Sequence, residues 1–509
     1  MTDDRYIASI DQGTTGTRFV VLNKEGAEVT SAYEEHKQIC PKPGWVEHDP
    51  MEIWEKTKRV IKRAIEKKNL DPKKIDAIGV ANQRETTLIW DFRTGMPLCN
   101  AIVWQCTRTR DICQKLIDRE LGGMIKDRTG LLINTYFSGP KIKWILDNIP
   151  KAKEKVQRGE AIFGNIDTWI IWKLTGGTRG GTHVTDYTNA SRTMLMNLKT
   201  LDWDDEILEE LNIPQEMMPS IRPSSDRSIY GYTKREGPLG AKIPICGDLG
   251  DQQAALFGQA CYHAGEVKNT YGTGNFMLVN TGSKPFSSKS GLLTTVAYGL
   301  EEGKVTYALE GAIAITGAAI QWLRDNLGLI KNASDTEKIA ASVPDSGGIY
   351  FVPAFSGLFS PYWDMDARGT IVGITRFVRK EHLVRATLES ICYRTKDVAD
   401  AMIADSGIRL TSLKVDGGAS KNNFLMQLQA DILGIPCIRP SFEETTALGS
   451  AYCAGLATGF WENLKDLRDI CKTYRKFEPI WSEAKREKEY AGWNKAVECS
   501  RRWGKRSYI

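Results

Sequence analysis

A loop rich in glycine and threonine follows the first apolar segment of the chain and contains the residue types that bind phosphate. It runs from Asp11 to Arg18 through Gly13, Thr14, Thr15, Gly16 and Thr17. Glycines let backbone N–H groups approach a polyanion, threonine hydroxyls add donors, and an aspartate can hold Mg²⁺ through water. The alternative is an ordinary threonine-rich hairpin, but the convergence of Asp, Thr and Arg in one turn favours phosphate binding. The loop is not a Walker A motif, because no Gly-Lys-Ser/Thr sequence closes it.

A second pair of chemically capable residues, Arg84 and Glu85, follows the strand-like segment 75–81. Adjacent guanidinium and carboxylate groups can direct donors and acceptors to neighbouring hydroxyls. Such a pair is often only a surface ion pair. Its place at the carboxyl end of a strand, where ligands bind in α/β folds, favours a binding role.

Two aspartates in the segment 247–253, Asp248 and Asp251, are candidates for a general base. Phosphoryl transfer requires the attacking hydroxyl to be oriented and its proton to be accepted. Composition alone does not choose between the two aspartates. An N-cap of the following helix is the structural alternative for Asp251.

The elements that must position these residues alternate in the manner of an α/β fold. Asp49 and Pro50 predict the start of a helix, which the strand-like segment 75–81 follows. In the second half, a strand around Val415 leads into a helix that Gly434 is expected to end.

A second glycine-rich turn lies in the segment 268–281, which contains the run Thr270-Tyr271-Gly272-Thr273-Gly274-Asn275 between strand-like stretches. It repeats the pattern of the first loop. Two related lobes, each with such a hairpin, imply a cleft between them. We place the boundary near Gly258, which predicts an N-terminal lobe of residues 1–258 and a C-terminal lobe of residues 259–509.

The length and composition suit a large soluble protein. With 509 residues and 41% apolar content, the chain can bury two sizeable cores. The net charge of +5 comes from interspersed acidic and basic residues, which argues against nucleic-acid binding.

The cysteines form no CxxC pair, and Cys246, Cys392, Cys437 and Cys453 have apolar neighbours, so we expect reduced, buried thiols. We see no targeting or spanning segment and expect a cytoplasmic protein without membrane insertion.

A series of segments between about Ile7 and Trp461 resembles, in unchanged order, those of a known family. The segments are SIDQGTTGTRF, PGWVEHDP, NQRETT, TYFSGPKIKW, DTWIIWKLTGG, TDYTNASRT, GDQQAALFGQ, KNTYGTGNF and VDGGASKNNFLMQ. They look like glycerol kinases, which belong to the FGGY carbohydrate kinases. The first loop alone is similar to that of any sugar kinase of the superfamily, and NQRETT with GDQQ and TYFSG narrows the match.

The resemblance implies an α/β protein with the two-lobed ribonuclease H-like, actin-like ATPase fold, in which ATP and substrate lie in the interlobe cleft. It implies ATP-dependent phosphorylation of glycerol to sn-glycerol 3-phosphate with Mg²⁺, as part of glycerol catabolism and glycerolipid precursor supply. We also expect a homo-oligomer, either a dimer or a tetramer.

The resemblance also implies roles for individual residues. The glycerol site would contain Arg84, Glu85, Trp104, Tyr136, Asp251, Gln252 and Phe276, with Asp251 as the catalytic base. The ATP phosphates would meet Thr14, Thr15, Gly16 and Arg18. The nucleotide would be lined on the second lobe by Thr273, Gly317, Gln321, Gly418 and Asn422. Asp11 would carry Mg²⁺ through water, with Asp251 close to the ion. Trp104 and Phe276 could instead be core aromatics, and the small residues 311–317 could reflect close helix packing.

The sequence departs from the family pattern at several positions. Cys106 stands where the family usually has an aspartate, which puts an ion pair near the pocket in doubt. Gly16 replaces a common serine. The segment 233–240 lacks the loop that binds fructose 1,6-bisphosphate in some bacterial members, and segment 224–234 lacks the histidine that the sugar phosphotransferase system phosphorylates in others. We therefore expect an enzyme insensitive to both.

Three alternatives to a glycerol kinase remain at this point. The first is another FGGY kinase acting on a sugar or polyol, against which Arg84, Glu85 and Tyr136 argue. The second, from a different class, is an actin- or Hsp70-like ATP-binding assembly protein, which would not need NQRETT or Tyr136. The third is a catalytically inactive regulatory paralogue, which the presence of every expected catalytic residue disfavours.

Overall fold

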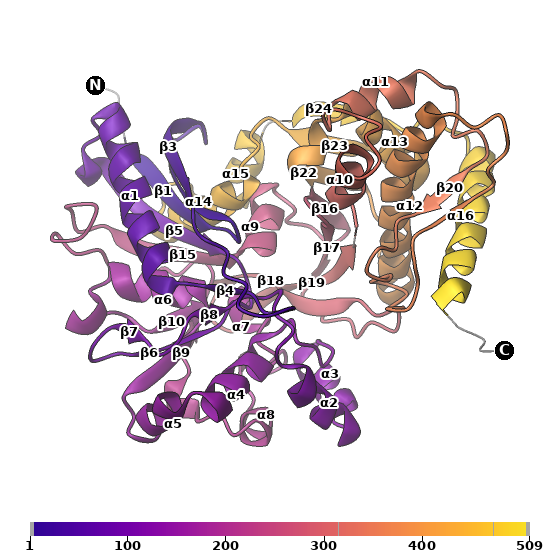
Figure 1. The fold of residues 1–509 in the computed structure, drawn as a ribbon. Helices are drawn as coiled ribbons and strands as arrows, with labels where there is room; N and C mark the ends of the chain where they lie inside the picture. The colour runs from indigo at the N-terminus through magenta and orange to yellow at the C-terminus, as the bar shows by residue number, and fades with distance from the viewer. Residues whose placement is uncertain (1–4, 314, 472, 505–509) are drawn as a thin grey trace.

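The protein has two lobes, and each is built on one mixed β-sheet (Figure 1). The computed structural model describes residues 5–313, 315–471 and 473–504. In Figure 1 the N-terminal half, indigo to magenta, lies on the left, and most of the C-terminal half, orange to yellow, lies on the right. Strands β18 and β19 run across the region where the lobes meet.

The described strands of the first sheet follow the order β14-β15-β5-β1-β2-β3. β1 and β2 form the expected antiparallel hairpin around the first loop, whereas β5 and β15 run parallel to β1. The carboxyl ends of β1, β5 and β15 therefore meet at one edge, where α/β folds bind ligands. The bounds are β1 Tyr6–Gln12, β2 Gly16–Leu22, β3 Glu28–Glu35, β5 Ile75–Asn82, β14 Gly231–Tyr232 and β15 Pro244–Gly250.

The helix predicted from Pro50 is α1 (Pro50–Lys68), and it covers one face of this sheet. Asp49 caps it, because its carboxylate accepts a hydrogen bond from the backbone N–H of Met51 at 2.8 Å. The buried Ile53 and Val60 lie on the side that packs against β2 and β3. The prediction from the cap and the apolar spacing is confirmed.

The described strands of the second sheet follow the order β18-β19-β17-β16-β22-β23-β24. β16 and β17 form the second predicted hairpin, and Gly434 ends helix α13 in the left-handed conformation, as expected. The strand bounds are β16 Glu266–Tyr271, β17 Asn275–Gly282, β18 Leu293–Glu301, β19 Lys304–Ile313, β22 Ser412–Asp416, β23 Cys437–Pro440 and β24 Thr473–Phe477. The helices around it are α10 Gly317–Asp325, α11 Asp335–Ala341, α12 Lys380–Ser406, α13 Asn423–Leu433 and α16 Glu483–Gly504.

Helix α14 (Thr445–Thr458) belongs to the C-terminal half of the sequence but packs on the first sheet, against β5, β15 and the short helix α9 (Asp251–Gly258) (Figure 1). The approach is unusually close. A Cβ atom on Gly79 of β5 would lie 2.0 Å from the backbone oxygen of Ser450, and one on Gly449 would lie 1.9 Å from that of Ala254. Residues from both halves of the chain therefore share one core.

This close packing makes a stability prediction. Gly449→Ala should lower the melting temperature, because the added methyl group meets backbone rather than a flexible side chain, and overpacking typically costs about 1–3 kcal/mol. Gly123→Ala is the matched control, since a Cβ atom there meets nothing within 4 Å. Differential scanning fluorimetry of both variants checks the prediction. A Gly449→Ala protein as stable as the control would contradict the described contact.

The remaining elements surround the two lobes and connect the sheets. The other helices are α2 Arg110–Asp118, α3 Gly122–Thr129, α4 Ser138–Asn148, α5 Pro150–Gln157, α6 Ile166–Leu174, α7 Tyr187–Ala190, α8 Asp205–Glu210 and α15 Leu464–Ile470. The short strands are β4 Glu47–His48, β6 Leu88–Asp91, β7 Met96–Pro97, β8 Ala101–Ile102, β9 Ala161–Gly164, β10 Val184–Asp186, β11 Met196–Asn197, β12 Asp202–Trp203, β13 Ser220–Arg222, β20 Tyr350–Val352 and β21 Thr370–Val372. Short 3₁₀ turns span Pro72–Lys74, Gly177–Arg179, Gln215–Met217 and Gly418–Lys421. Within the described ranges, no helix combines the length and the apolar character that crossing a bilayer requires.

The cysteines lie as the sequence predicts. All eleven fall within the described residues and carry free thiols. Cys246, Cys392, Cys437 and Cys453 are buried, and burial raises the pKa of each thiol. These residues therefore act as small apolar side chains in the core.

Candidate active site

A cavity of about 540 Å³ lies where the carboxyl edge of the first sheet faces the second hairpin. Every residue of the expected glycerol site lines it, namely Arg84, Glu85, Trp104, Tyr136, Asp251, Gln252 and Phe276. Thr14, Thr15 and Thr273 line the same cavity. The fold thus brings residues from distant parts of the sequence to one place, next to the first phosphate-type loop.

The Arg84–Glu85 pair lies directly after β5 and is not at the surface. Each residue is 2% exposed, which excludes the surface ion pair as an explanation. Glu85 has a left-handed backbone conformation with φ of +58°, unusual for a residue other than glycine. Such a conformation costs about 1–3 kcal/mol and is typical of functional sites.

Aromatic rings form one wall of the cavity. The ring of Trp104 lies edge-on to Tyr136 and to Phe276, with centroids 5.5 and 6.2 Å away. All three side chains are partly exposed to the cavity, so they are not fully buried core aromatics. The indole N–H of Trp104 donates to Thr14 Oγ1 at 2.9 Å, which ties this wall to the first loop.

Asp251 is the first residue of α9, and Gly250 takes the N-cap position. The Oδ1 atom of Asp251 accepts a hydrogen bond from the backbone of Gln252 at 2.7 Å and lies 3.3 Å from Arg84 Nε. Burial raises the pKa of Asp251, and Arg84 and Lys268 oppose this shift. A carboxylate with a raised pKa at the cavity wall suits proton acceptance.

Asp248, the other candidate base, lies away from this cavity. It is completely buried, and burial together with Asp167 and Asp186 raises its pKa well above the usual range. A hydrogen bond to Asp167 further favours the protonated form of Asp248. The geometry therefore favours Asp251 over Asp248, a choice that composition leaves open.

The surroundings of Asp11 fit a magnesium ion. Burial and the carboxylates of Asp251 and Glu444 raise the pKa of Asp11 to about 7, although Arg18 opposes the shift. A divalent cation would add positive charge to this group of carboxylates, beyond that which Arg18 supplies to Glu444 and Arg84 to Asp251. Among the described residues, no group of three or more His, Cys, Asp and Glu side chains is placed to hold an ion directly. An ion at Asp11 would therefore take its remaining ligands from water and phosphate oxygens.

A second cavity, of about 420 Å³, lies on the C-terminal lobe and shares Gly272 and Thr273 with the first. It is lined by all the residues expected at the nucleotide, namely Thr273, Gly317, Gln321, Gly418 and Asn422. Gly317 also packs closely, because a Cβ atom there would lie 2.7 Å from the backbone oxygen of Gly272. For segment 311–317, close packing and ligand binding were given as alternatives. Gly317 both packs closely and lines the cavity.

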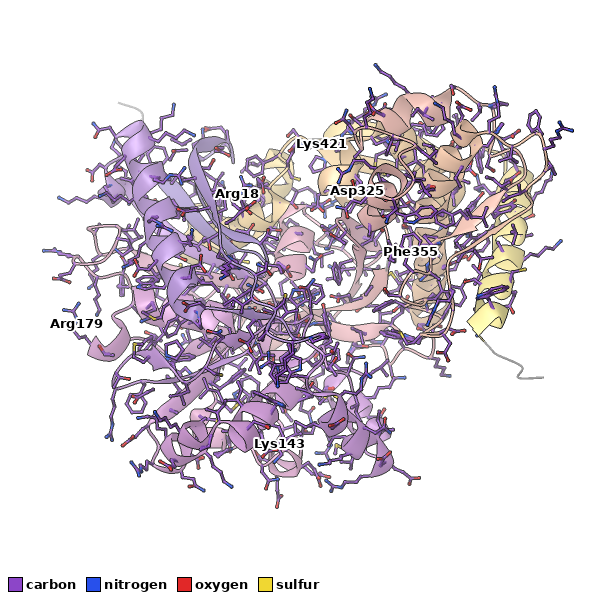
Figure 2. All side chains as sticks on the ribbon, in the orientation of Figure 1. Arg18, Lys143, Arg179, Asp325, Phe355 and Lys421 are labelled. Atoms are coloured by element: carbon purple, nitrogen blue, oxygen red, sulfur yellow. The ribbon has the colours of Figure 1, made fainter. Side chains whose placement is uncertain are left out.

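Two residues of the expected phosphate loop line neither cavity. Arg18 forms an ion pair with Glu444 at 2.9 Å, and Figure 2 shows it on the side of the N-terminal lobe that faces the C-terminal lobe. At Gly16, a Cβ atom would lie 2.6 Å from the hydroxyl oxygen of Tyr33. Tyr33 thus fills the space that a side chain at position 16 would need, which explains why Gly16 stands where serine is common.

Arg108, which would pair with the aspartate that Cys106 replaces, has a different partner. Arg108 Nη2 lies 2.6 Å from Glu47 Oε1, and its Nε donates to Cys106 Sγ at 3.0 Å. The guanidinium also contacts the rings of Trp45 and Trp144, whose centroids are 3.9 and 4.8 Å from its central carbon. The charge of Arg108 is therefore balanced although the aspartate is absent.

Two charged residues that were not predicted from the sequence, Arg192 and Glu310, lie behind the first cavity. Both are completely buried, and both bind the Arg84–Glu85 pair. Burial alone would raise the pKa of Glu310, but Arg192 and Arg84 lower it to about 2. An acidic residue inside the apolar run 308–313 was the available signal, because a buried charge needs a partner.

Comparisons with known proteins agree along the whole chain. Residues 6–258 match the N-terminal domain model of the FGGY family of carbohydrate kinases, and residues 267–458 match its C-terminal domain model. The glycerol kinase of Caldanaerobacter subterraneus subsp. tengcongensis is 59% identical, over 98% of this chain and 99% of that protein. Glycerol kinase 2 of Thermotoga maritima is 57% identical, over 99% and 100%.

The solved structures show the same relationship. The crystal structure of Plasmodium falciparum glycerol kinase with ADP superposes with a TM-score of 0.92 at 39% identity, covering 98% of both chains. A xylulose kinase from Lactobacillus acidophilus superposes with a TM-score of 0.84 at 24% identity, covering 97% of both chains. The second match shows a shared fold alone.

Proposed function

Because the chain belongs to the FGGY family of carbohydrate kinases, and to the glycerol kinases within it, we infer that it transfers a phosphoryl group from ATP to glycerol. The product is sn-glycerol 3-phosphate, and Mg²⁺ is the associated metal. One observation from the structure carries this assignment furthest. The cavity lined by Arg84, Glu85 and Asp251 presents hydroxyl-binding groups beside the glycine-rich loop that contains Thr14.

We propose a division of roles between the lobes. Residues 1–258 bind glycerol and the phosphates, and residues 259–509 bind the nucleotide. The positions of the two cavities support this division, since they meet at Gly272 and Thr273 between the lobes. Each hairpin then lies on one side of the transferred phosphoryl group.

In the proposed mechanism, Arg84, Glu85 and Tyr136 orient the glycerol hydroxyls, while Trp104 and Phe276 pack on its carbon chain. Asp251 accepts the proton of the attacking hydroxyl as the new P–O bond forms. Backbone N–H groups of the first loop and the hydroxyls of Thr14 and Thr15 stabilise charge on the phosphoryl oxygens. When bound near Asp11, Mg²⁺ supplies positive charge to the phosphates.

A coupled ADP-release assay with glycerol, dihydroxyacetone, xylulose and ribulose tests this function. Glycerol should give the highest kcat/KM, because the polar groups of the site match three neighbouring hydroxyls. A preference for xylulose or ribulose would identify another FGGY kinase. ATP hydrolysis that none of the acceptors stimulates would instead favour an assembly protein.

Ligand binding should close the two lobes around the transferred phosphoryl group. Such closure excludes water from the reaction and is common among kinases. Glycerol with a non-hydrolysable ATP analogue should therefore reduce the radius of gyration in small-angle X-ray scattering. An unchanged radius of gyration, with binding of both ligands established by calorimetry, would count against closure.

We further propose that the enzyme works in the cytoplasm as a homo-oligomer, either a dimer or a tetramer. The free, mostly buried thiols support a reducing compartment. Met365, Ile374 and Phe377 have exposed apolar side chains that self-association could cover. Light scattering coupled to size-exclusion chromatography measures the oligomeric state.

A further inference from the structure

Four buried charges lie together behind the glycerol-binding groups. Arg84 and Glu85 line the cavity, and Arg192 and Glu310 lie behind them, with none of the four side chains more than 2% exposed. Arg192 follows the short helix α7, whereas Glu310 lies on β19 of the second sheet. Their charges balance, since two guanidinium groups face two carboxylates. Isolated charges at such depth would be very unfavourable, so the pairing is a requirement of the fold.

The hydrogen bonds of Arg84 restrict how it can meet a substrate. Its Nη1 donates to Gln253 Oε1 at 3.1 Å and to Glu310 Oε2, and its Nη2 donates to Glu310 Oε1 at 3.0 Å. Both ends of the guanidinium fork are therefore held from behind. The Nε atom, 3.3 Å from Asp251 Oδ1, is on the side of the expected base.

Glu85 is held in a corresponding way. Arg192 Nε donates to Glu85 Oε1 at 2.6 Å, and Arg192 Nη2 donates to Glu310 Oε1 at 3.1 Å. Among the described residues, no hydrogen bond to Glu85 Oε2 is found, so this oxygen can accept from a hydroxyl. The guanidinium of Arg192 also lies 5.5 Å from the ring of Tyr136. One arginine thus contacts two of the expected glycerol-binding side chains.

We propose that Arg192 and Glu310 are positioning residues that set the affinity and specificity for glycerol. They hold Arg84 and Glu85 so that the N–H donors of Arg84 not used by Gln253 and Glu310, and the Oε2 atom of Glu85, remain for neighbouring hydroxyls. This inference rests on the proposed assignment of Arg84 and Glu85 to glycerol. Because Glu310 comes from the second sheet, the same contacts align the acceptor site with the C-terminal lobe.

The variant Glu310→Gln tests the proposal by keeping the shape of the side chain while removing its charge. The KM for glycerol should rise about tenfold or more, since a hydrogen bond to a charged group is lost and Arg84 can turn toward Asp251. The KM for ATP should stay within about twofold, because the nucleotide cavity is elsewhere. Equal changes for glycerol and ATP, or no change for glycerol, would overturn the proposal.

A matched control separates positioning from simple loss of stability. Arg394 and Asp397 form a buried pair at 2.8 Å, each side chain 1% exposed, and neither lines the two cavities. Asp397→Asn should lower the melting temperature without raising the KM for glycerol. If both variants raised that KM in proportion to their instability, a general structural role would explain the result.

The double variant Arg192→Met/Glu310→Met gives a second, independent readout. The two substitutions replace the buried Arg192–Glu310 pair by apolar side chains, which is often neutral for stability, and leave Arg84 and Glu85, 3.8 Å apart, to balance each other. The double variant should melt closer to the wild type than Glu310→Gln does, yet keep the raised KM for glycerol. Glycerol affinity that returns together with stability would contradict positioning. Arg84→Ala serves as the reference variant. If Arg84→Ala leaves the KM for glycerol unchanged, the assignment of Arg84 to glycerol binding is wrong. If Arg84→Ala raises that KM but Glu310→Gln does not, the assignment holds and only the positioning role of Glu310 is wrong.

Discussion

Replacing Asp251 by asparagine should lower kcat by a factor of about 10²–10⁴, because the attacking hydroxyl loses the group that accepts its proton. Nucleotide binding should hardly change, since Asp251 lines the cavity that contains the glycerol-binding groups and not the one expected to hold the nucleotide. Steady-state kinetics gives kcat, and calorimetry with ADP gives nucleotide affinity. A variant that keeps nearly wild-type kcat would show that Asp251 is not the base.

The pH dependence of kcat is a second test of Asp251 as the base. Burial raises the pKa of Asp251, so the proton-accepting form is populated only above that raised value. The kcat of the wild type should therefore rise with pH on the acidic side, and Asp251→Asn should lose this dependence. Asp248→Asn is the control. Because burial and the carboxylates of Asp167 and Asp186 raise the pKa of Asp248, an uncharged amide is a close substitute for it, and kcat should be retained.

Arg84→Ala should reduce kcat/KM for glycerol by about 1–3 kcal/mol, as the loss of a buried hydrogen-bonding group does. The carboxylates of Glu310 and Glu85 would also lose a buried partner, which should lower the melting temperature. The KM for ATP should change little. Arg84→Lys is an informative companion, because a lysine keeps the charge but cannot form the fork to Glu310. Equal losses for glycerol and ATP would point to a folding defect.

Local patterns predicted much of the fold. The first hairpin, the cap of α1 by Asp49 and the end of α13 at Gly434 each depend on neighbouring residues, and all three are confirmed. The resemblance also predicted the two-lobed ribonuclease H-like, actin-like ATPase fold and the glycerol kinase activity, which the comparisons confirm. The position of α14 against β5 was not predicted, because close contact between segments distant in the chain leaves no local pattern.

The candidate site also contains residues that the sequence predicted and residues that it did not. Arg84 and Gln321 were predicted as binding residues from the motifs that contain them, and both line a cavity in the structure. Arg192 and Glu310 were missed because their partners are distant: Glu310 lies 226 residues from Arg84 and 118 from Arg192. The ion pair between Arg18 and Glu444 could not be foreseen for the same reason. Spacing along a chain identifies binding groups more readily than the charges that balance them.

The location of α14 has a consequence for biosynthesis. The strands of the first sheet are complete once residue 250 has been made, but the helix that covers β5 and β15 ends at residue 458. A nascent chain emerges from the ribosome N-terminus first. Throughout translation of the intervening segment, the β5–β15 face around Ala77 and Leu249 therefore has no helix α14 to cover it. The first core can therefore be completed only after residue 458 has been made, so assembly of the N-terminal lobe waits for synthesis of a segment about 200 residues further along the chain.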